Sequence, residues 1–182
     1  KEVGSNMAEI FEWDPARRTP RPLFGQGERE DYVVAYGAEE GELLVLTPKL
    51  GDWRRLYRRV GDKLDPITPE QRADVTSFSI DRARSRILVT INDGGRTRIA
   101  AYDARTKKPI ELPRIEDADH VTPASTTRDG RYTTLQIDTG VAPPASFVLD
   151  WKTKKLTPWH APSAPEIDTK RFARPTLERY KA

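Results

Sequence analysis

Cysteine is absent from the 182-residue chain, and histidine occurs only twice. The missing thiols exclude disulfide bonds, thiolate metal sites and a cysteine nucleophile. His120 and His160 lie 40 residues apart, a spacing that matches no common metal-binding motif. The segment Glu116–Asp119 offers carboxylate oxygens, but it lacks the glycine and the distal glutamate of a calcium loop, which favours a solvated turn. We therefore expect no metal and no cofactor.

Long apolar runs are also missing. The longest unbroken aliphatic stretch is Leu43–Leu46, far short of the ~18 residues that a membrane-spanning helix needs. The N-terminal stretch has no apolar core of a secretory signal, and residues 1–6 resemble a cut end or a cloning remnant. We expect a soluble protein without a membrane span, and bacterial cytoplasm and periplasm both stay open as its compartment.

The charges of the two signs nearly balance, with 31 Lys and Arg against 28 Asp and Glu. Dedicated nucleic-acid binders concentrate a basic excess on one face, so we expect no nucleic-acid partner. The octet Trp53–Val60 is the exception, because Arg54, Arg55, Arg58 and Arg59 accompany apolar residues at helical spacing. It is either a basic surface for nucleic acid or anionic membrane, or a short surface element with solvated or paired guanidiniums. Its shortness favours the second interpretation.

An internal repeat organises the chain. Asp103–Lys108 recurs as Asp150–Lys155 at an offset of 47 residues. Upstream, Val75–Ser79 is matched by Val121–Ser125 at an offset of 46 residues, and Asp14–Thr19 is a weaker echo of the first pair. Matches at nearly constant offset indicate stacked copies of one supersecondary unit.

Each copy is predicted to form four short antiparallel strands. Ile87, Val89 and Ile91 alternate with other residues, as in a strand with one face better buried than the other, and Asn92–Gly95 tolerates the positive φ of a tight hairpin. Four strands in ~45 residues are typical of a β-propeller blade, whereas a β-sandwich requires no repetition. The predicted fold class is all-β: a partial β-propeller built of four-stranded antiparallel blades. The expected strands are 75–79, 87–92, 98–102 and 110–112, then 121–125, 132–138, 145–149 and 156–159.

The remaining segments are less regular. Residues 7–24 are expected to be the remnant of a blade, 25–70 an incomplete blade with a connector, and 161–182 a linker with a short strand at Leu177–Tyr180. The two repeated blades are assigned to residues 71–114 and 115–160.

The chain carries, in this order, Ser79–Asp81, Arg86–Thr90, Asn92–Gly95, Ala101–Asp103, Leu156–Trp159 and Arg174–Ala182. This series resembles the non-catalytic propeller of the prolyl oligopeptidase family of serine peptidases, which includes acylaminoacyl and dipeptidyl peptidases. The likeness is clearest over residues 75–182.

The resemblance implies that the catalytic serine belongs to an α/β-hydrolase domain outside these residues. None of the chain's serines stands in the G-x-S-x-G motif of a nucleophile elbow, so no catalytic residue is assigned. Whether the protein to which these residues belong is an enzyme therefore rests on the resemblance. It also implies that residues 161–182, with Arg174, Pro175 and Tyr180, form a linker toward that absent domain.

The expected function is thus a propeller fragment that acts as a substrate-gating lid of such a peptidase. Peptide substrates would be partners only through the absent catalytic domain. The alternative is a stand-alone β-propeller that serves as a protein-binding scaffold, because the fold alone does not choose between functions. Open blade edges invite pairing between chains, so we also expect a dimer or a larger oligomer.

Overall fold

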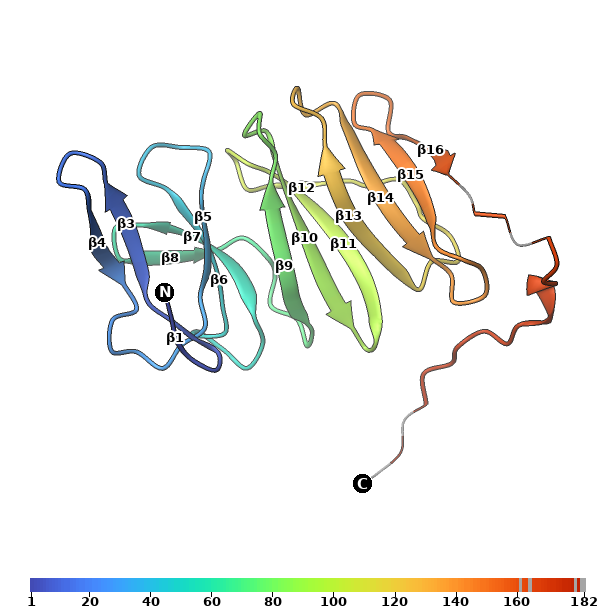
Figure 1. Cartoon of the computed structure of the whole chain (residues 1–182), viewed down its shortest axis with the longest axis horizontal. Helices are drawn as coiled ribbons and strands as arrows, with labels where there is room; N and C mark the ends of the chain where they lie inside the picture. The colour runs from blue at the N-terminus through green and yellow to red at the C-terminus, as the bar shows by residue number, and fades with distance from the viewer. Residues whose placement is uncertain (161, 164, 179, 181–182) are drawn as a thin grey trace. The chain divides into compact units, whose positions relative to one another are not determined.

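The computed structural model describes residues 1–160, 162–163, 165–178 and 180. Its regular structure is almost entirely β-strand, with the 3-10 helix Thr169–Arg171 near the C-terminus (Figure 1). The chain divides into two compact units, Lys1–Val75 and Thr76–Ala182. Within the described part of the chain, no helix is long and apolar enough to cross a membrane.

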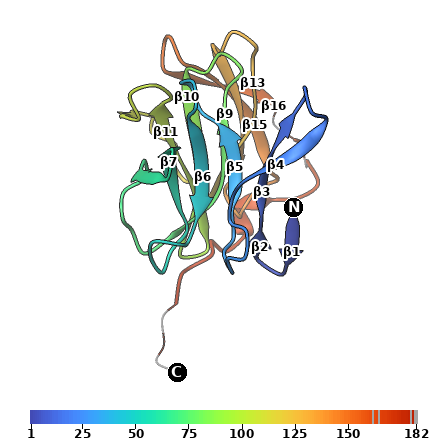
Figure 2. The same ribbon diagram turned by 90° about the vertical axis from the view of Figure 1, so that its left-hand side faces the viewer.

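The first unit contains two hairpins and one four-stranded antiparallel sheet. The hairpins are β1 (Glu2–Gly4) with β2 (Met7–Ala8), and β3 (Ile10–Asp14) with β4 (Thr19–Phe24). Figure 2 shows β5 and β6 side by side in the sheet, whose strand order is β5-β6-β7-β8. The sheet consists of β5 (Val33–Tyr36), β6 (Leu43–Thr47), β7 (Arg55–Val60) and β8 (Lys63–Pro66).

Two features of this sheet differ from the sequence-based expectation. It has four strands, two more than the hairpin expected within residues 25–70. The apolar residues of Trp53–Val60 have helical spacing, but the segment does not form a helix. Arg55–Val60 forms the strand β7, which pairs with both β6 and β8. Leu56 and Tyr57 are buried neighbours on opposite faces of this strand, whereas Trp53 and Val60 are exposed. Burial on two faces overrides the helical pattern of the isolated octet.

The second unit consists of the two repeated blades. Blade I contains β9 (Asp74–Ile80), β10 (Arg86–Asp93), β11 (Arg96–Asp103) and β12 (Pro109–Ile110); β9 starts two residues before the unit boundary. Blade II contains β13 (His120–Thr126), β14 (Tyr132–Asp138), β15 (Ala145–Asp150) and β16 (Lys155–His160). Neighbouring strands within each blade pair antiparallel, and one parallel contact between Thr97 and His120 joins β11 to β13. The predicted positions of seven strands are confirmed, whereas the strand expected at 110–112 forms as β12 at Pro109–Ile110 and overlaps its predicted position at Ile110 alone. The predicted fold class is confirmed.

A single apolar cluster lies between the two blades. Leu88 and Ala101 of blade I pack with Leu135, Ile137 and Leu149 of blade II. In β14, the buried side chains Thr133, Leu135 and Ile137 alternate with less buried ones, so one face of this strand meets the cluster. Burial of this shared apolar surface stabilises the two blades as one unit.

The repeated Asp turns have the same geometry in all three copies. Asp14, Asp103 and Asp150 each accept a hydrogen bond at Oδ1 from the backbone N–H two residues later, at 2.9–3.0 Å. The residue four positions after each Asp has positive φ: Arg18, Lys107 and Lys154. A carboxylate that caps its own turn explains why Asp recurs at this position.

We expect Trp151→Ala to lower the free energy of unfolding by about 3–5 kcal/mol, because it removes a large buried side chain from the junction between the blades. Urea denaturation followed by circular dichroism measures the change. Trp159→Ala is the matched control, since Trp159 is 78% exposed, and it should change stability by less than about 0.5 kcal/mol. Equal losses in the two variants would show that Trp151 does not hold the blades together.

Candidate functional site

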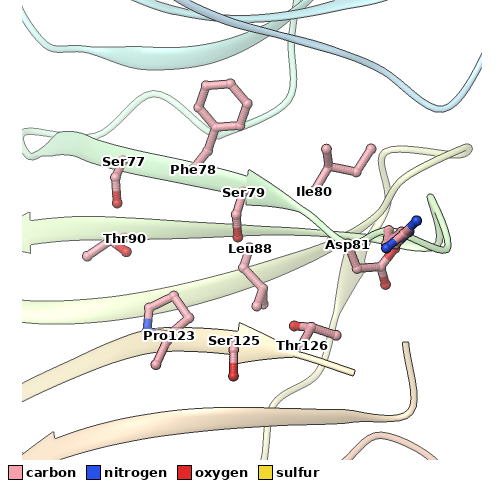
Figure 3. A pocket seen from close by; sticks show the side chains of 12 residues that line it. Ser77, Phe78, Ser79, Ile80, Asp81, Leu88, Thr90, Pro123, Ser125 and Thr126 are labelled. Carbon is pink, nitrogen blue, oxygen red and sulfur yellow. The ribbon is translucent and has the colours of Figure 1, made fainter. Parts of the chain in front are cut away.

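A groove lies between the blades of the second unit, with a volume of about 240 Å³. Figure 3 shows its walls: β9 on one side, the end of β13 on the other, and Leu88 and Thr90 of β10 between them. Several of the lining side chains carry hydroxyl groups. These are Ser77, Ser79, Thr90, Ser125 and Thr126.

The β13 wall of the groove is fixed by hydrogen bonds between hydroxyl groups. The hydroxyls of Ser125 and Thr134 lie 2.9 Å apart, and those of Thr126 and Thr133 lie 2.8 Å apart. The register shifts between Pro123 and Ser125, and Thr134 Oγ1 accepts the Ser125 N–H at 3.0 Å. A bulge of this kind reorients side chains next to a site. The groove can therefore hydrogen-bond a polar main chain, and its lining includes no histidine that would serve as a base.

A contact between the blades lies next to Asp81, one of the residues that line the groove. Arg86 of blade I donates hydrogen bonds to the Gly130 carbonyl of blade II and to Asp81 Oδ2, the latter at 3.2 Å. Its guanidinium carbon lies 4.7 Å from the centre of the Trp151 ring, in cation–π geometry. A Cβ atom at Gly130 would lie 3.1 Å from Asp81 Oδ2, and φ there is +74°. Glycine therefore allows the two turns to approach each other.

Trp151 is also held by residues of its own blade, blade II. Its Nε1–H donates to Thr133 Oγ1 at 2.7 Å, and the Lys154 ammonium lies 5.1 Å from its ring centre. Large aromatic side chains usually pack inside a fold, so the sequence predicts that Trp13, Trp151 and Trp159 pack in or between blades. The structure confirms this for Trp151, but the prediction is wrong for Trp13 and Trp159, which are 60% and 78% exposed. The contact with Arg86 was missed, because Arg86 and Trp151 occupy different positions of the repeat and aligning the two copies does not bring them together.

The aspartates that cap the repeated turns have lowered pKa values. The Thr106 N–H lowers the pKa of Asp103 below its ordinary value of 3.8, and the Arg131 guanidinium lowers the pKa of Asp150. The pKa of Asp14 is lowered mainly by the Arg17 N–H. Each of these carboxylates accepts hydrogen bonds that are stronger to its ionised form, which favours ionisation.

The four arginines proposed as a basic surface are placed by β7 and the residue before it. All four have acidic neighbours in the first unit: Arg54 pairs with Asp31 at 2.9 Å, Arg55 with Glu70 at 3.9 Å, Arg58 with Glu42 at 3.4 Å, and Arg59 with Asp62 at 2.8 Å. The Glu42 side chain is 1% exposed, so its pairing with Arg58 satisfies a buried charge. This arrangement fits paired structural guanidiniums.

The residues proposed as a linker cross one end of the second unit. Arg174 Nη1 donates to Asp117 Oδ1 at 2.7 Å, and this contact lowers the pKa of Asp117. A Cβ atom at Gly140 would lie 3.1 Å from the Pro175 ring, so glycine makes room for the tail. Tyr180 is 90% exposed. The strand expected at Leu177–Tyr180 does not form: Leu177, Glu178 and Tyr180 have no regular structure, and Arg179 lies outside the described residues.

The two histidines lie apart from the groove. His120 Nδ1 is 3.0 Å from Thr97 Oγ1, at the contact between β11 and β13, and His160 ends β16. Over the residues that the structure describes, no group of three or more His, Cys, Asp or Glu side chains is placed to hold a metal ion.

The lowered pKa values predict acid destabilisation. A folded-state pKa below 3.8 contributes stability that is present above that pH and is lost as the pH falls through the folded value. Asn at positions 103 and 150 keeps the capping oxygen but does not titrate. Asp103→Asn with Asp150→Asn should therefore lose less stability than the unchanged chain between about pH 5 and about pH 3, measured by urea denaturation. Asp52→Asn removes an exposed carboxyl that caps no described turn, and it should keep the full pH dependence.

No protein-family model matches the chain, and a comparison with curated proteins finds no match. Many solved structures share its fold. One from a study of two prolyl endopeptidases has a TM-score of 0.71 at 16% identity, over 88% of this chain and 24% of that one. Prolyl oligopeptidase B from Galerina marginata has a TM-score of 0.73 at 10% identity, over 89% of this chain and 23% of that one. TolB from Acinetobacter baumannii has a TM-score of 0.58 at 14% identity, over 82% of this chain and 37% of that one.

The chain thus spans about a quarter of the length of the peptidases that it matches. At these identities the likeness is one of fold. Taken with the two repeated blades, the matches show that this chain has the fold of the propeller portion of prolyl oligopeptidase family peptidases.

Proposed function

We propose that the chain is the non-catalytic propeller part of a prolyl-oligopeptidase-like serine peptidase, and that it acts as a lid that gates peptide substrates. The observation that carries this proposal is the fold match, in which most of this chain aligns with a quarter of a peptidase. The sequence series that ends in Arg174–Ala182 points to the same family independently of the structure.

The structure of the second unit supports a gating role in two ways. The groove between the blades offers hydroxyl groups from Ser79 and Ser125, which suit the main chain of an unfolded peptide better than a folded protein surface. The tail is tied to the blades through Arg174 and Asp117, so a domain that follows it would be held close to this end of the unit. In this arrangement the following domain cleaves the peptide, and the propeller restricts which chains reach it.

The proposal is tested by the coding sequence that follows Ala182. We expect a G-x-S-x-G motif within about 200 residues, followed by an Asp and a His in that order. We also expect the 182-residue chain alone to release no product from chromogenic peptide substrates. A stop codon directly after Ala182, or peptide hydrolysis by the chain that a fluorophosphonate blocks, would contradict the proposal.

A second candidate function is a stand-alone scaffold for protein binding. The likeness to TolB favours it, because that match covers 82% of this chain and its name refers to no peptidase. The coding sequence separates the two candidates, since a scaffold needs no downstream hydrolase motif.

The expected self-association concerns the blade edges. The last strand of each four-stranded unit carries a proline: Pro66 in β8, Pro109 in β12 and Pro158 in β16. Proline has no N–H to donate, so these outer edges are poor templates for another strand. Association would then use other surfaces, such as the edge of β9, which contains no proline.

Light scattering of the concentrated chain tests self-association, with a dimer or larger species as the expected result. Thr76→Pro with Phe78→Pro, placed on β9, should shift the chain toward monomer. Pro158→Val, placed on β16, is the control and should leave the dimer unchanged. A monodisperse monomer of the unchanged chain would contradict the prediction.

A further inference from the structure

Four turns of the second unit lie at the same end of the two blades (Figure 1). They connect β9 to β10, β11 to β12, β13 to β14, and β15 to β16, and they comprise residues 81–85, 103–108, 127–131 and 150–155. Because consecutive strands of a blade run antiparallel, its first and third turns share one end. We call this surface the basic end.

The turns of the basic end carry far more positive than negative charge. They contain ten Lys and Arg residues and only four Asp residues. The positive residues are Arg82, Arg84, Arg105, Lys107, Lys108, Arg128, Arg131, Lys152, Lys154 and Lys155. Eight of these are exposed, the exceptions being the half-buried Arg84 and Lys107.

The four aspartates are used within the turns. Asp81, Asp103, Asp129 and Asp150 each accept a hydrogen bond from a backbone N–H of their own turn, at 2.7–3.0 Å. Their side chains therefore point back into the turns, while most of the lysines and arginines extend into solvent. Asp150 also pairs with Arg131 at 3.2 Å. The geometry of the turns thus leaves a net positive surface.

The loops at the opposite end of the same unit contain more acidic than basic residues. The loops 93–96, 114–119 and 138–145 contain five acidic residues and two arginines. The acidic residues are Asp93, Glu116, Asp117, Asp119 and Asp138. Four of these acids pair with arginines, Arg98 and Arg174 among them, so this end is close to neutral. The positive charge of the second unit is therefore concentrated at the basic end, which attracts anions.

The tail leaves from the opposite end. Arg174 pairs with Asp117 there, and Pro175 lies beside Gly140. If the proposed function holds, a catalytic domain follows the tail on this side. The basic end then faces away from the catalytic domain, and arriving peptides meet it first.

We propose that the basic end binds acidic segments of unfolded peptide substrates and steers them toward the propeller. This inference rests on the proposed gating function and names the class of substrate. Nucleic acid is the less fitting partner, because single strands bind by stacking on exposed aromatic rings, and the ring within these turns, Trp151, is 6% exposed. A membrane surface is also less fitting, because the turns carry no exposed large apolar side chain for insertion.

The test measures binding of the 182-residue chain to a fluorescent peptide of alternating Glu and Ser by fluorescence anisotropy. A peptide of the same length with Gln in place of Glu is the reference. We expect binding of the acidic peptide alone, weakening as added salt screens the charges. Lys108→Gln, Arg128→Gln, Lys152→Gln and Lys155→Gln together should weaken it by about tenfold.

A variant with the same net charge is the control. Arg17→Gln, Lys63→Gln, Arg98→Gln and Arg114→Gln remove four exposed cations that lie outside the basic end. This variant should keep affinity within about twofold of the unchanged chain. Equal weakening in both variants would show a response to net charge and overturn the proposal. Tighter binding of a single-stranded oligonucleotide or of anionic vesicles than of the acidic peptide would also overturn it.

The two proposals fail in different ways. A missing hydrolase motif after Ala182 contradicts the peptidase lid but leaves the binding measurement intact. Absence of acidic-peptide binding, with the motif present, contradicts the steering role alone.

Discussion

The second unit depends on the contact of Arg86 with the neighbouring blade. A guanidinium that stacks on Trp151 and donates to the Gly130 carbonyl joins two blades that also meet through apolar side chains and, near their other end, through the pairing of Thr97 with His120. Apolar packing alone is non-directional and would permit the blades to slide. The directional hydrogen bonds fix the angle between them, and that angle defines both the groove and the alignment of the four turns at one end. Asp81, whose side chain is 4% exposed, supplies the matching charge.

The parts of the fold that the sequence predicted are those in which local chemistry decides the structure. The Asp turns repeat because a carboxylate caps each of them, and the strands between them alternate with period two, as β14 does. Two copies of such a unit suffice to indicate a propeller, and seven of the eight strands of the two blades lie where the repeat placed them, β12 being the exception. The resemblance to peptidase propellers used these same residues, and the fold matches agree with it.

Other parts depend on neighbours that a linear pattern does not contain. β7 has helical spacing in sequence, but pairing with β6 and β8 makes it a strand. In β10, Leu88 and Val89 point to opposite faces and are both buried, so the expected contrast between a better and a worse buried face is lost. The contact between Arg86 and Trp151 joins different positions of the repeat, and aligning the copies cannot reveal it.

Charge shows the same dependence on geometry. A net charge of +3 argues against an electrostatic function when the charges are counted along the chain. The antiparallel strands then sort those charges, because alternate turns go to alternate ends of a blade. In the recurring turns the Asp is held inward by backbone N–H groups while Lys and Arg extend outward, so each copy of the repeat adds positive potential to the same end. A nearly neutral chain thus builds a polarised unit, and the repeat that specifies its strands also specifies its field.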